Sequence, residues 1–154
     1  MIRRLRPDDL NAVIALDARI MGRRRDEYSR LKLKRALSQT GVEVSLAAQH
    51  DGFFAGFLLA LVYYGEFGML EPVAVLDTIG VSPDYRRQGI GKALFEQMLL
   101  QLEALNIPRL TTEVAWSDQE LLRFLHDEGF TPAPRLCLDL DVAAARRRSR
   151  LAEV

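Results

Sequence analysis

The sequence predicts a single α/β domain with a mixed central sheet flanked by helices. The chain has 154 residues and a mass of 17.4 kDa, which is the size of one compact domain. Hydrophobic residues make up 49% and charged residues 27%, as in globular chains that bury a core. Short apolar runs typical of strands alternate along the chain with segments that have helical periodicity. We therefore expect residues 1–154 to form one domain.

The first quarter of the chain predicts one strand followed by two helices. Ile2–Arg6 is a short strand candidate, and Asp8–Ile20 is a helix that its first residue can cap. A second helix begins at Asp26 or Glu27 and ends at Gly41. Its apolar stripe is weak and consists of Tyr28, Leu31, Leu33 and Leu37.

The middle of the chain predicts three strands. Val42–His50 and Phe53–Tyr64 flank Asp51-Gly52, a dipeptide that favours the tight turn of an antiparallel hairpin. A loop over Gly65–Glu71 follows. Val73–Val81 reads VAVLDTIGV, which is apolar on both faces, as in a central strand covered on both sides.

The remaining elements alternate helix and strand. Gly89–Leu105 has a clear helical stripe, and Leu110–Trp116 is a strand that we expect to run parallel to Val73–Val81 through a right-handed crossover. Gln119–Asp127 is a helix that Asp118 can cap. A last strand over Arg135–Leu140 precedes a basic tail.

Charge and hydropathy exclude several functional classes. The 21 basic and 21 acidic residues cancel, whereas a protein that binds nucleic-acid backbone is normally basic, so we expect no nucleic-acid partner. The arginine runs Arg23–Arg25 and Arg146–Arg150 are interpreted as solvated surface. The longest apolar run, Phe53–Tyr64, has 12 residues, fewer than the roughly 20 that span a bilayer.

Cysteine usage and the N-terminal residues indicate a reducing compartment. Cys137 is the only cysteine, so neither an internal disulfide nor a cysteine-rich metal site is expected. The opening MIRRLRPDDL reaches aspartates before any apolar segment and therefore does not resemble a signal peptide. We expect a cytoplasmic protein without a membrane partner and without a bound metal.

The junction between the predicted strand ending at Val81 and the next helix is the strongest candidate site. It reads VSPDYRRQGIGKAL and places Gly89 and Gly91 where the helix begins. Free backbone N–H groups and the positive end of the helix dipole attract phosphate at such a junction. Glycine lets a ligand approach the backbone, and Arg86 and Arg87 add positive charge. The sequence therefore predicts a diphosphate site.

Two common nucleotide motifs do not fit this junction. A P-loop requires a leading glycine where Arg86 stands and a hydroxyl residue where Ala93 stands. A dinucleotide fingerprint requires a third small residue, but Leu94 occupies that position.

The pattern Arg-x-x-Gly-x-Gly remains, written here as Arg86, Arg87, Gln88, Gly89, Ile90 and Gly91. With it the sequence resembles the GCN5-related N-acetyltransferases (GNAT), whose acetyl-coenzyme A loop is [RQ]-x-x-G-x-[GA]. The segment DTIGVSPDYRRQGIG resembles that family's strand and turn, and Gly129-Phe130 resembles its Gly-Phe pair after the last helix. The predicted order of elements is also that of the family.

This resemblance implies a GNAT-like acyl-CoA N-acyltransferase fold and transfer of acetyl from acetyl-CoA to a primary amine by direct attack in a ternary complex. The backbone near Ile79, Gly80 and Val81, where the family's fourth strand has a bulge, would hold the pantetheine and polarise the thioester. The loop that would hold the diphosphate consists of Arg86, Arg87, Gln88, Gly89, Ile90, Gly91 and Lys92.

A base is expected to take the proton of the attacking amine, and burial suits a carboxylate to that task. Asp77, on the apolar strand, is the first candidate, although it could equally serve only to bind backbone or a neighbouring side chain. Glu113 and Glu71 are further candidates. The position used by histone-acetylating relatives is Val75 here.

The chain departs from the family at the proton donor. Many relatives have a tyrosine where this chain has Leu125; Tyr63, Tyr64, Tyr85 or His126 could replace it. A non-catalytic acyl-CoA-binding module and a nucleotide-binding regulatory domain therefore remain alternatives. The sequence does not identify the acceptor. One of Arg23–Arg25 is a candidate contact to an acidic group on it. A homodimer through the edge of the last strand is also possible.

Overall fold

The computed structural model describes residues 1–38, 43–65, 68 and 70–153. Met1–Ser117 form one compact unit, and Asp118–Val154 form a second. The expectation that residues 1–154 are a single domain stays a prediction.

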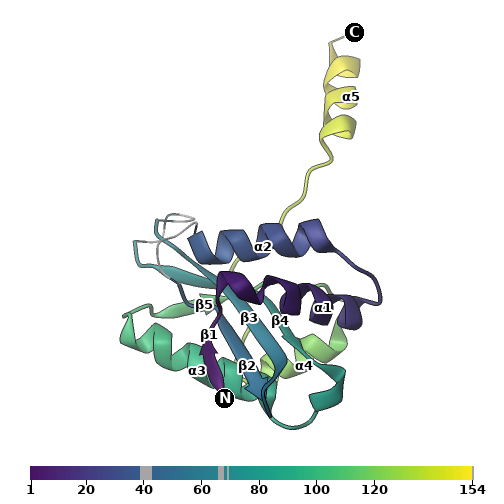
Figure 1. The fold of residues 1–154 in the computed structure, drawn as a ribbon. Coiled ribbons are helices and arrows are strands. Elements are labelled where there is room, and N and C mark those ends of the chain that lie inside the picture. Colours follow the sequence, from purple (N-terminus) through teal and green to yellow (C-terminus); the bar gives the residue numbers. More distant parts are fainter. Residues whose placement is uncertain (39–42, 66–67, 69, 154) are drawn as a thin grey trace. The chain divides into compact units, whose positions relative to one another are not determined.

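The first unit contains a five-stranded mixed sheet in the order β1-β2-β3-β4-β5 (Figure 1). Neighbouring strands are antiparallel, except β4 and β5, which are parallel. This confirms the predicted α/β class and the predicted parallel pair. The strands are β1 (Ile2–Arg4), β2 (Leu46–His50), β3 (Phe53–Tyr63), β4 (Val73–Val81) and β5 (Arg109–Thr111).

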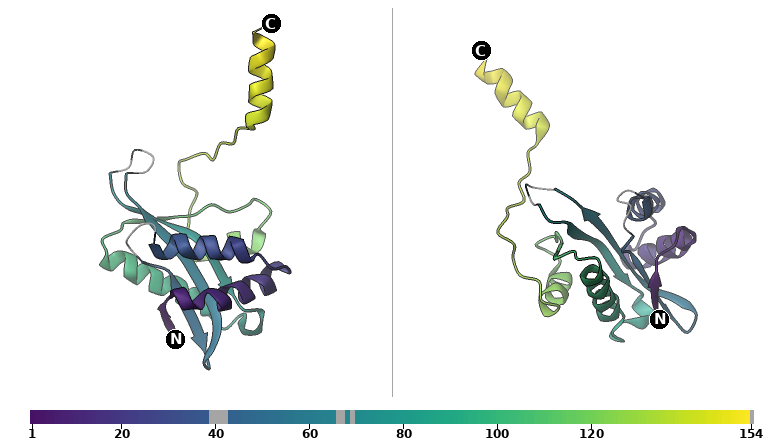
Figure 2. Two further views of the ribbon diagram at one scale, coloured as in Figure 1. Left: turned by 45° about the horizontal axis from the view of Figure 1, so that its top comes forward. Right: turned by 90° about the vertical axis from the view of Figure 1, so that its left-hand side faces the viewer.

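Helices cover both faces of this sheet. Helices α1 (Leu10–Met21) and α2 (Asp26–Ser38) lie on one face, and α3 (Ile90–Ala104) lies on the other (Figure 2). Buried Val13, Leu16 and Leu33 pack with Phe57 and Leu59 of β3 on the first face. The buried residues of α3 are Leu94, Phe95, Met98 and Leu102. The central strands are therefore apolar on both faces, as predicted for β4.

The β2–β3 hairpin has the predicted tight turn. Asp51 and Gly52 have φ angles of 51° and 80°, the left-handed conformation that favours these two residue types. The strand before it begins at Leu46 and not at Val42, which lies outside the described residues together with Gly41.

Some predicted boundaries and stripes were wrong. The first helix does not begin at Asp8: a single 3-10 turn, η1 (Pro7–Asp9), precedes α1, and the Asp9 carboxylate accepts a hydrogen bond from the Arg6 N–H at 2.7 Å. On α2, Tyr28 and Leu31 are exposed, because Ser29, Leu33 and Ala36 form the buried face.

The predicted strand Leu110–Trp116 is shorter than expected, since β5 ends at Thr111. The Thr112 hydroxyl donates a hydrogen bond to the Leu76 carbonyl oxygen at 2.8 Å, so a side chain makes the contact to β4 that a backbone N–H would otherwise make. Backbone pairing of β4 with β5 is limited to Val73–Val75.

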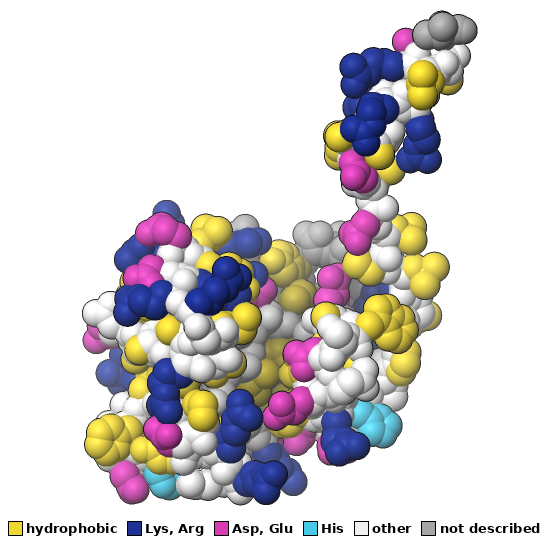
Figure 3. All heavy atoms as spheres, turned by 90° about the vertical axis from the view of Figure 1, so that its right-hand side faces the viewer, with side chains coloured by type: hydrophobic (Ala, Val, Ile, Leu, Met, Phe, Trp, Pro, Cys, Tyr) yellow, Lys and Arg dark blue, Asp and Glu magenta, His cyan; other side chains and the backbone are white. Residues whose placement is uncertain are grey.

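The second unit contains α4 (Gln119–Asp127) and α5 (Val142–Ala152). The Asp118 carboxylate caps α4 by accepting from the Leu121 N–H at 3.1 Å, as predicted. The basic tail forms α5, which Asp141 caps in the same way at 3.0 Å. Basic side chains cover much of the visible surface of α5 in Figure 3, and the arginines of this helix are Arg146, Arg147, Arg148 and Arg150.

The predicted last strand, Arg135–Leu140, was wrong. These residues are exposed and adopt no regular structure, and the Arg135 N–H bonds locally to the Ala133 carbonyl. A strand requires a neighbouring backbone for its hydrogen bonds, and the ladder within the described residues ends at β5. The strand edge that we expected to mediate a homodimer is therefore not formed. The homodimer itself stays a prediction.

Candidate functional site

The junction between β4 and α3 brings the predicted loop residues together in one exposed turn. After Val81 the chain passes through buried Ser82 and a 3-10 turn, η3 (Pro83–Tyr85), before α3 begins at Ile90. Arg87 and Gly89 have φ angles of 64° and 76°, so two of the loop residues adopt the left-handed conformation. Gly89 is the N-cap of α3 and provides no capping side chain.

The start of α3 leaves backbone donors available. The first bond of the helix runs from the Ala93 N–H to the Gly89 carbonyl at 2.9 Å. The helix therefore provides no carbonyl partner for the N–H groups of Ile90, Gly91 and Lys92. These donors and the dipole give this end a positive potential, which exposed basic side chains of the loop increase. The arrangement suits a diphosphate.

Arg19 of α1 fastens the loop to the body of the domain. Its guanidinium donates two hydrogen bonds of 3.0 Å to the Asp84 carboxylate and a longer one of 3.4 Å to the Ser82 hydroxyl. Hydrogen bonding from Arg19 holds the pKa of Asp84 below its usual value. The Ser82 N–H also bonds to the Ala55 carbonyl of β3 at 2.8 Å. The strand end and the 3-10 turn are thus fixed from both sides.

Two glycines allow β3, β4 and α3 to approach closely. A Cβ atom at Gly56 would lie 2.9 Å from the Gly80 carbonyl oxygen and 3.3 Å from the Ile90 side chain. A Cβ at Gly80 would lie 2.9 Å from the Phe57 ring. The two distances of 2.9 Å are shorter than van der Waals contact, so Gly80, a predicted cofactor-binding residue, has a packing role.

Strand β4 has a bulge at Asp77 and an open edge beyond it. Thr78 pairs with Leu59 of β3 and Leu76 with Ala60, so Asp77 is the extra residue. The bulge therefore lies at Asp77 and not at Ile79–Val81, where the sequence resemblance placed it. Among the described residues, β5 pairs with β4 only as far as Val75, so the edge of β4 that would face β5 has no strand partner there over residues 76–81.

The Asp77 carboxylate contacts two side chains. Its Oδ1 accepts a hydrogen bond from the Lys32 ammonium at 2.9 Å, and its Oδ2 accepts one from the Thr78 hydroxyl at 3.0 Å. The side chains of Lys32 and Asp77 are 23% and 20% exposed, so solvent reaches the pair. These contacts are compatible with both predicted roles of Asp77. As a structural residue it binds neighbouring side chains, and as a general base it lies at hydrogen-bond distance from an amine.

A polar cluster on α1 and α2 lies next to this pair. Arg25 forms two hydrogen bonds with the buried Asp17 carboxylate, at 2.6 and 3.0 Å. The Arg25 guanidinium carbon lies 4.0 Å from the centre of the Tyr28 ring, and the Lys32 nitrogen lies 5.4 Å from it. Hydrogen bonding to Asp17 raises the pKa of Arg25 above its ordinary value.

Sequence reasoning missed Lys32 and Asp17, and it left Arg25 among three equivalent arginines. In the structure Arg24 pairs with Asp26 and Arg25 with Asp17, so two of the three arginines bind carboxylates of the chain itself. The helical spacing of Tyr28 and Lys32 was the available signal, since residues four apart share a face.

The other predicted catalytic residues lie elsewhere. Glu113 is exposed and follows the end of β5 instead of lying on it, and Glu71 is exposed before β4. Tyr85 contacts the His50 ring with centroids 5.0 Å apart. In the second unit Leu125 is buried and His126 is exposed.

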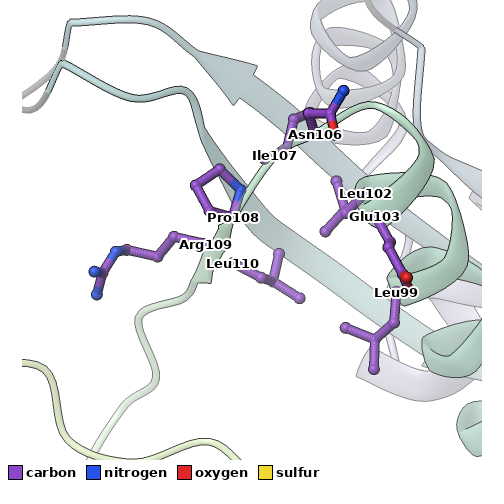
Figure 4. Close-up of a pocket in the computed structure, with 8 residues that line it drawn as sticks. All are labelled: Leu99, Leu102, Glu103, Asn106, Ile107, Pro108, Arg109 and Leu110. Atoms are coloured by element: carbon purple, nitrogen blue, oxygen red, sulfur yellow. The ribbon is translucent and has the colours of Figure 1, made fainter.

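A hollow of about 510 Å³ opens between the C-terminal end of α3 and β5 (Figure 4). Leu99, Leu102 and Leu110 point into it, whereas Arg109 points away. None of the predicted site residues lines it. Within residues 1–38, 43–65, 68 and 70–153, no cluster of three or more histidine, cysteine or acidic side chains could hold a metal ion. The helices of these same ranges include none with the length and apolarity to cross a membrane.

The family model for the acetyltransferase (GNAT) family matches residues 10–130. The chain belongs to the GNAT family. The match includes the Arg86–Gly91 loop, Asp77 and the Gly129-Phe130 pair, and it confirms the resemblance drawn from these motifs.

Two curated relatives of this GNAT chain carry the same enzyme name. [Ribosomal protein bS18]-alanine N-acetyltransferase of Escherichia coli strain K12 is 34% identical over 83 residues, which are 54% of this chain and 51% of the relative. The same enzyme of Shigella flexneri matches equally well. The chain thus spans about half the length of the curated relatives that it matches.

Solved structures confirm the GNAT fold. An aminoglycoside N-acetyltransferase, AAC(6')-Iy in complex with CoA, superimposes with a TM-score of 0.74 at 18% identity and covers 92% of this chain and 94% of its own. A ribosomal-protein-alanine N-acetyltransferase from Brucella melitensis biovar Abortus 2308 has a TM-score of 0.74 at 20% identity and covers 92% and 99%.

Proposed function

We propose that this protein is an acetyl-CoA-dependent N-acetyltransferase that acetylates a primary amine by direct attack in a ternary complex. The observation that carries the proposal is the start of α3 behind the Arg86–Gly91 loop, which has no side-chain cap and lies next to a β4 edge that lacks a strand partner within the described part of the chain. Membership of the GNAT family supports it.

The diphosphate of acetyl-CoA binds at the loop. The N–H groups of Ile90, Gly91 and Lys92 meet the phosphate oxygens, and Arg86, Arg87 and Gln88 lie beside them. Gly89 leaves the approach open, because apart from adjacent backbone and chain neighbours no heavy atom of the described residues lies within 4 Å of the position that its Cβ would take. The pantetheine follows the open edge of β4 past Ile79, Gly80 and Val81, and its amide groups meet the backbone there.

Asp77 serves as the general base for the acceptor. A base must be within hydrogen-bond reach of the proton that it removes, and Asp77 already holds the Lys32 amine at 2.9 Å. The acceptor ammonium takes the place of Lys32, transfers a proton to the carboxylate, and its nitrogen attacks the thioester carbonyl carbon. The carbon–sulfur bond breaks with its electron pair on sulfur, and the thiolate takes the proton from Asp77. The nitrogen releases its second proton to water, so the products are the acetylated amine, coenzyme A and one proton. Glu113 is the second candidate base.

The named relatives indicate two acceptor classes for this site. One is an alanine of a ribosomal protein, and the other is an aminoglycoside. Both present a primary amine, which is the group that the chemistry at Asp77 requires.

The first test separates charge from backbone geometry at Gly89. Both aspartate and asparagine tolerate the left-handed conformation, so Gly89→Asp and Gly89→Asn form a matched pair that differs by one negative charge. Calorimetric titration with acetyl-CoA, coenzyme A, ATP and NAD gives the affinities, and thermal shift checks folding. We expect coenzyme A species alone to bind, with Gly89→Asp weakened about tenfold or more relative to Gly89→Asn, or about 1.4 kcal/mol.

Equal affinities of the two variants would mean that the diphosphate does not bind this loop. Turnover is then measured as thiol release with an alanine-terminated peptide and with an aminoglycoside. Binding of acetyl-CoA without turnover on any amine would support the non-catalytic acyl-CoA-binding module instead.

A further inference from the structure

Lys32 is the amine that the structure places at the proposed base. Its Nζ donates a hydrogen bond to the Asp77 Oδ1 at 2.9 Å, across 45 positions of the sequence. Lys32 lies on α2 and Asp77 at the bulge of β4, so the contact depends on the packing of the helix against the sheet. Nucleophile and base are already within the distance required for proton transfer.

The enclosed space beside this amine is small. Lys32, Tyr28 and Thr78 border a hollow of only about 10 Å³ between α1, α2 and the sheet. A volume of this size holds at most one water molecule. In this structure, the hydrogen-bond position at the Asp77 Oδ1 that an acceptor amine would take is occupied by the Lys32 amine.

We propose that Lys32 is an acetylation site of this protein, modified within the same molecule by its own acetyl-CoA site. The inference rests on the proposed function, because the thioester must lie along the open edge of β4 beside Asp77. It adds an internal acceptor that the transfer to an external amine does not require.

The step balances as an ordinary acyl transfer. The Lys32 ammonium gives one proton to the Asp77 carboxylate, and its nitrogen then forms a bond to the thioester carbonyl carbon. The carbon–sulfur bond breaks with its electron pair on sulfur, and the thiolate takes the proton from Asp77. A second proton leaves the nitrogen for water, so the products are N-acetyl-lysine, coenzyme A and a released proton.

The chain offers unusually clear internal controls, because Lys32, Lys34 and Lys92 are its only lysines. Lys34 lies on the same helix but is exposed, and residues two positions apart do not share a helix face. Lys34 therefore reports the rate of chemical acetylation by acetyl-CoA in solution.

The test incubates the full-length protein with acetyl-CoA, digests it at intervals and measures the acetylated fraction of each lysine by mass spectrometry. We expect Lys32 to be acetylated about 100-fold faster than Lys34, which is the low end of the contribution of a general base. The rate at Lys32 should not depend on protein concentration. Asp77→Asn should reduce it to the rate of Lys34 without changing Lys34 itself.

Excess free coenzyme A provides a second measurement that needs no variant. It occupies the acetyl-CoA site without an acyl group, so it should slow acetylation of Lys32 and leave Lys34 unchanged. Equal rates at the two lysines, or no effect of either Asp77→Asn or coenzyme A, would overturn the inference.

Failure of this inference differs from failure of the proposed function. If calorimetry shows binding of acetyl-CoA and an external amine is acetylated while Lys32 stays unmodified, only the internal acceptor is wrong. If acetyl-CoA does not bind, both are wrong.

Discussion

Asp77 divides its two carboxylate oxygens between different tasks. The Thr78 hydroxyl binds Oδ2 at 3.0 Å and so fixes the side-chain rotamer, while Oδ1 holds an ammonium at 2.9 Å. Its place at a bulge gives this carboxylate a position on β4 that has no direct partner on β3. An oriented carboxylate that already binds an amine needs little reorganisation to accept a proton from one.

We expect Asp77→Asn to lower kcat for an external amine about 100-fold or more, because the amide cannot accept the proton. Affinity for acetyl-CoA should stay nearly unchanged, since the diphosphate binds at the loop. Steady-state thiol release and calorimetry measure the two quantities. Glu113→Gln is the matched control and should change kcat much less, because Glu113 is exposed beyond the end of β5. A larger loss in Glu113→Gln than in Asp77→Asn would assign the base to Glu113.

At the scale of elements, side chains fix where strands and turns end. The Thr112 hydroxyl donates a hydrogen bond to the Leu76 carbonyl just beyond the point where β5 stops pairing with β4, and from there the edge of β4 has no strand partner among the residues that the structure describes. Arg19 ties the C-terminal turn of α1 to the 3-10 turn that carries Asp84. The site therefore depends on side-chain contacts from two places in the same unit. Thr112 contacts β4, and Arg19 of α1 contacts the 3-10 turn of the loop.

The first strand and the start of α1 are joined by an ion pair between Arg3 and Asp9. The two side chains make hydrogen bonds of 2.8 Å, and only 15% and 10% of their surfaces are exposed. Hydrogen bonding from Arg3 holds the pKa of Asp9 below its usual value. A carboxylate whose pKa is lowered by folding stabilises the protein above its unfolded pKa, and this contribution is lost as the pH falls through the folded value.

We therefore expect the free energy of unfolding to be about 1–3 kcal/mol higher for the wild type than for Asp9→Asn at pH 7. The difference should shrink as the pH falls below about 4, because the Asp9 carboxyl then becomes protonated first in the unfolded chain and, at lower pH, in the folded protein. Urea denaturation of both proteins between pH 3 and 7 measures it. Asp8→Asn is the control and should lack this pH dependence, since Asp8 is an exposed neighbour of the pair. A difference between wild type and Asp9→Asn that grows as the pH falls would contradict this account.

At the scale of the whole molecule, contiguous features could be predicted from sequence and distant contacts could not. The Arg86–Gly91 loop and the Asp51-Gly52 turn depend on local backbone conformation, which the residue types reveal directly. Lys32 and Asp77 meet across 45 positions, and no local pattern encodes that contact. The alternating pattern of Arg135–Leu140 has strand character, but a strand also needs a partner, which the pattern alone does not supply.

The C-terminal helix contributes little to the stability of the rest of the chain. No side chain of α5 is buried, and an isolated helix of this length is only marginally stable in water. We expect truncation after Asp141 to change the melting temperature by no more than about 2 °C, because the loss of exposed side chains costs about 0.5 kcal/mol or less. Affinity for acetyl-CoA should also be unchanged. Differential scanning calorimetry and titration of the truncated and intact proteins measure both quantities.

The matched control for the truncation is Leu125→Ala in the same unit. Leu125 is 4% exposed, so its replacement should cost about 2–5 kcal/mol and lower the melting temperature clearly. If the truncation destabilises the protein as much as Leu125→Ala does, then α5 packs against another surface in solution, either on the same molecule or on a second copy. Light scattering would separate these two cases, because only the second changes the molecular mass in solution. A small effect of the truncation beside a large effect of Leu125→Ala would instead show that the stability of Asp118–Val154 depends on α4.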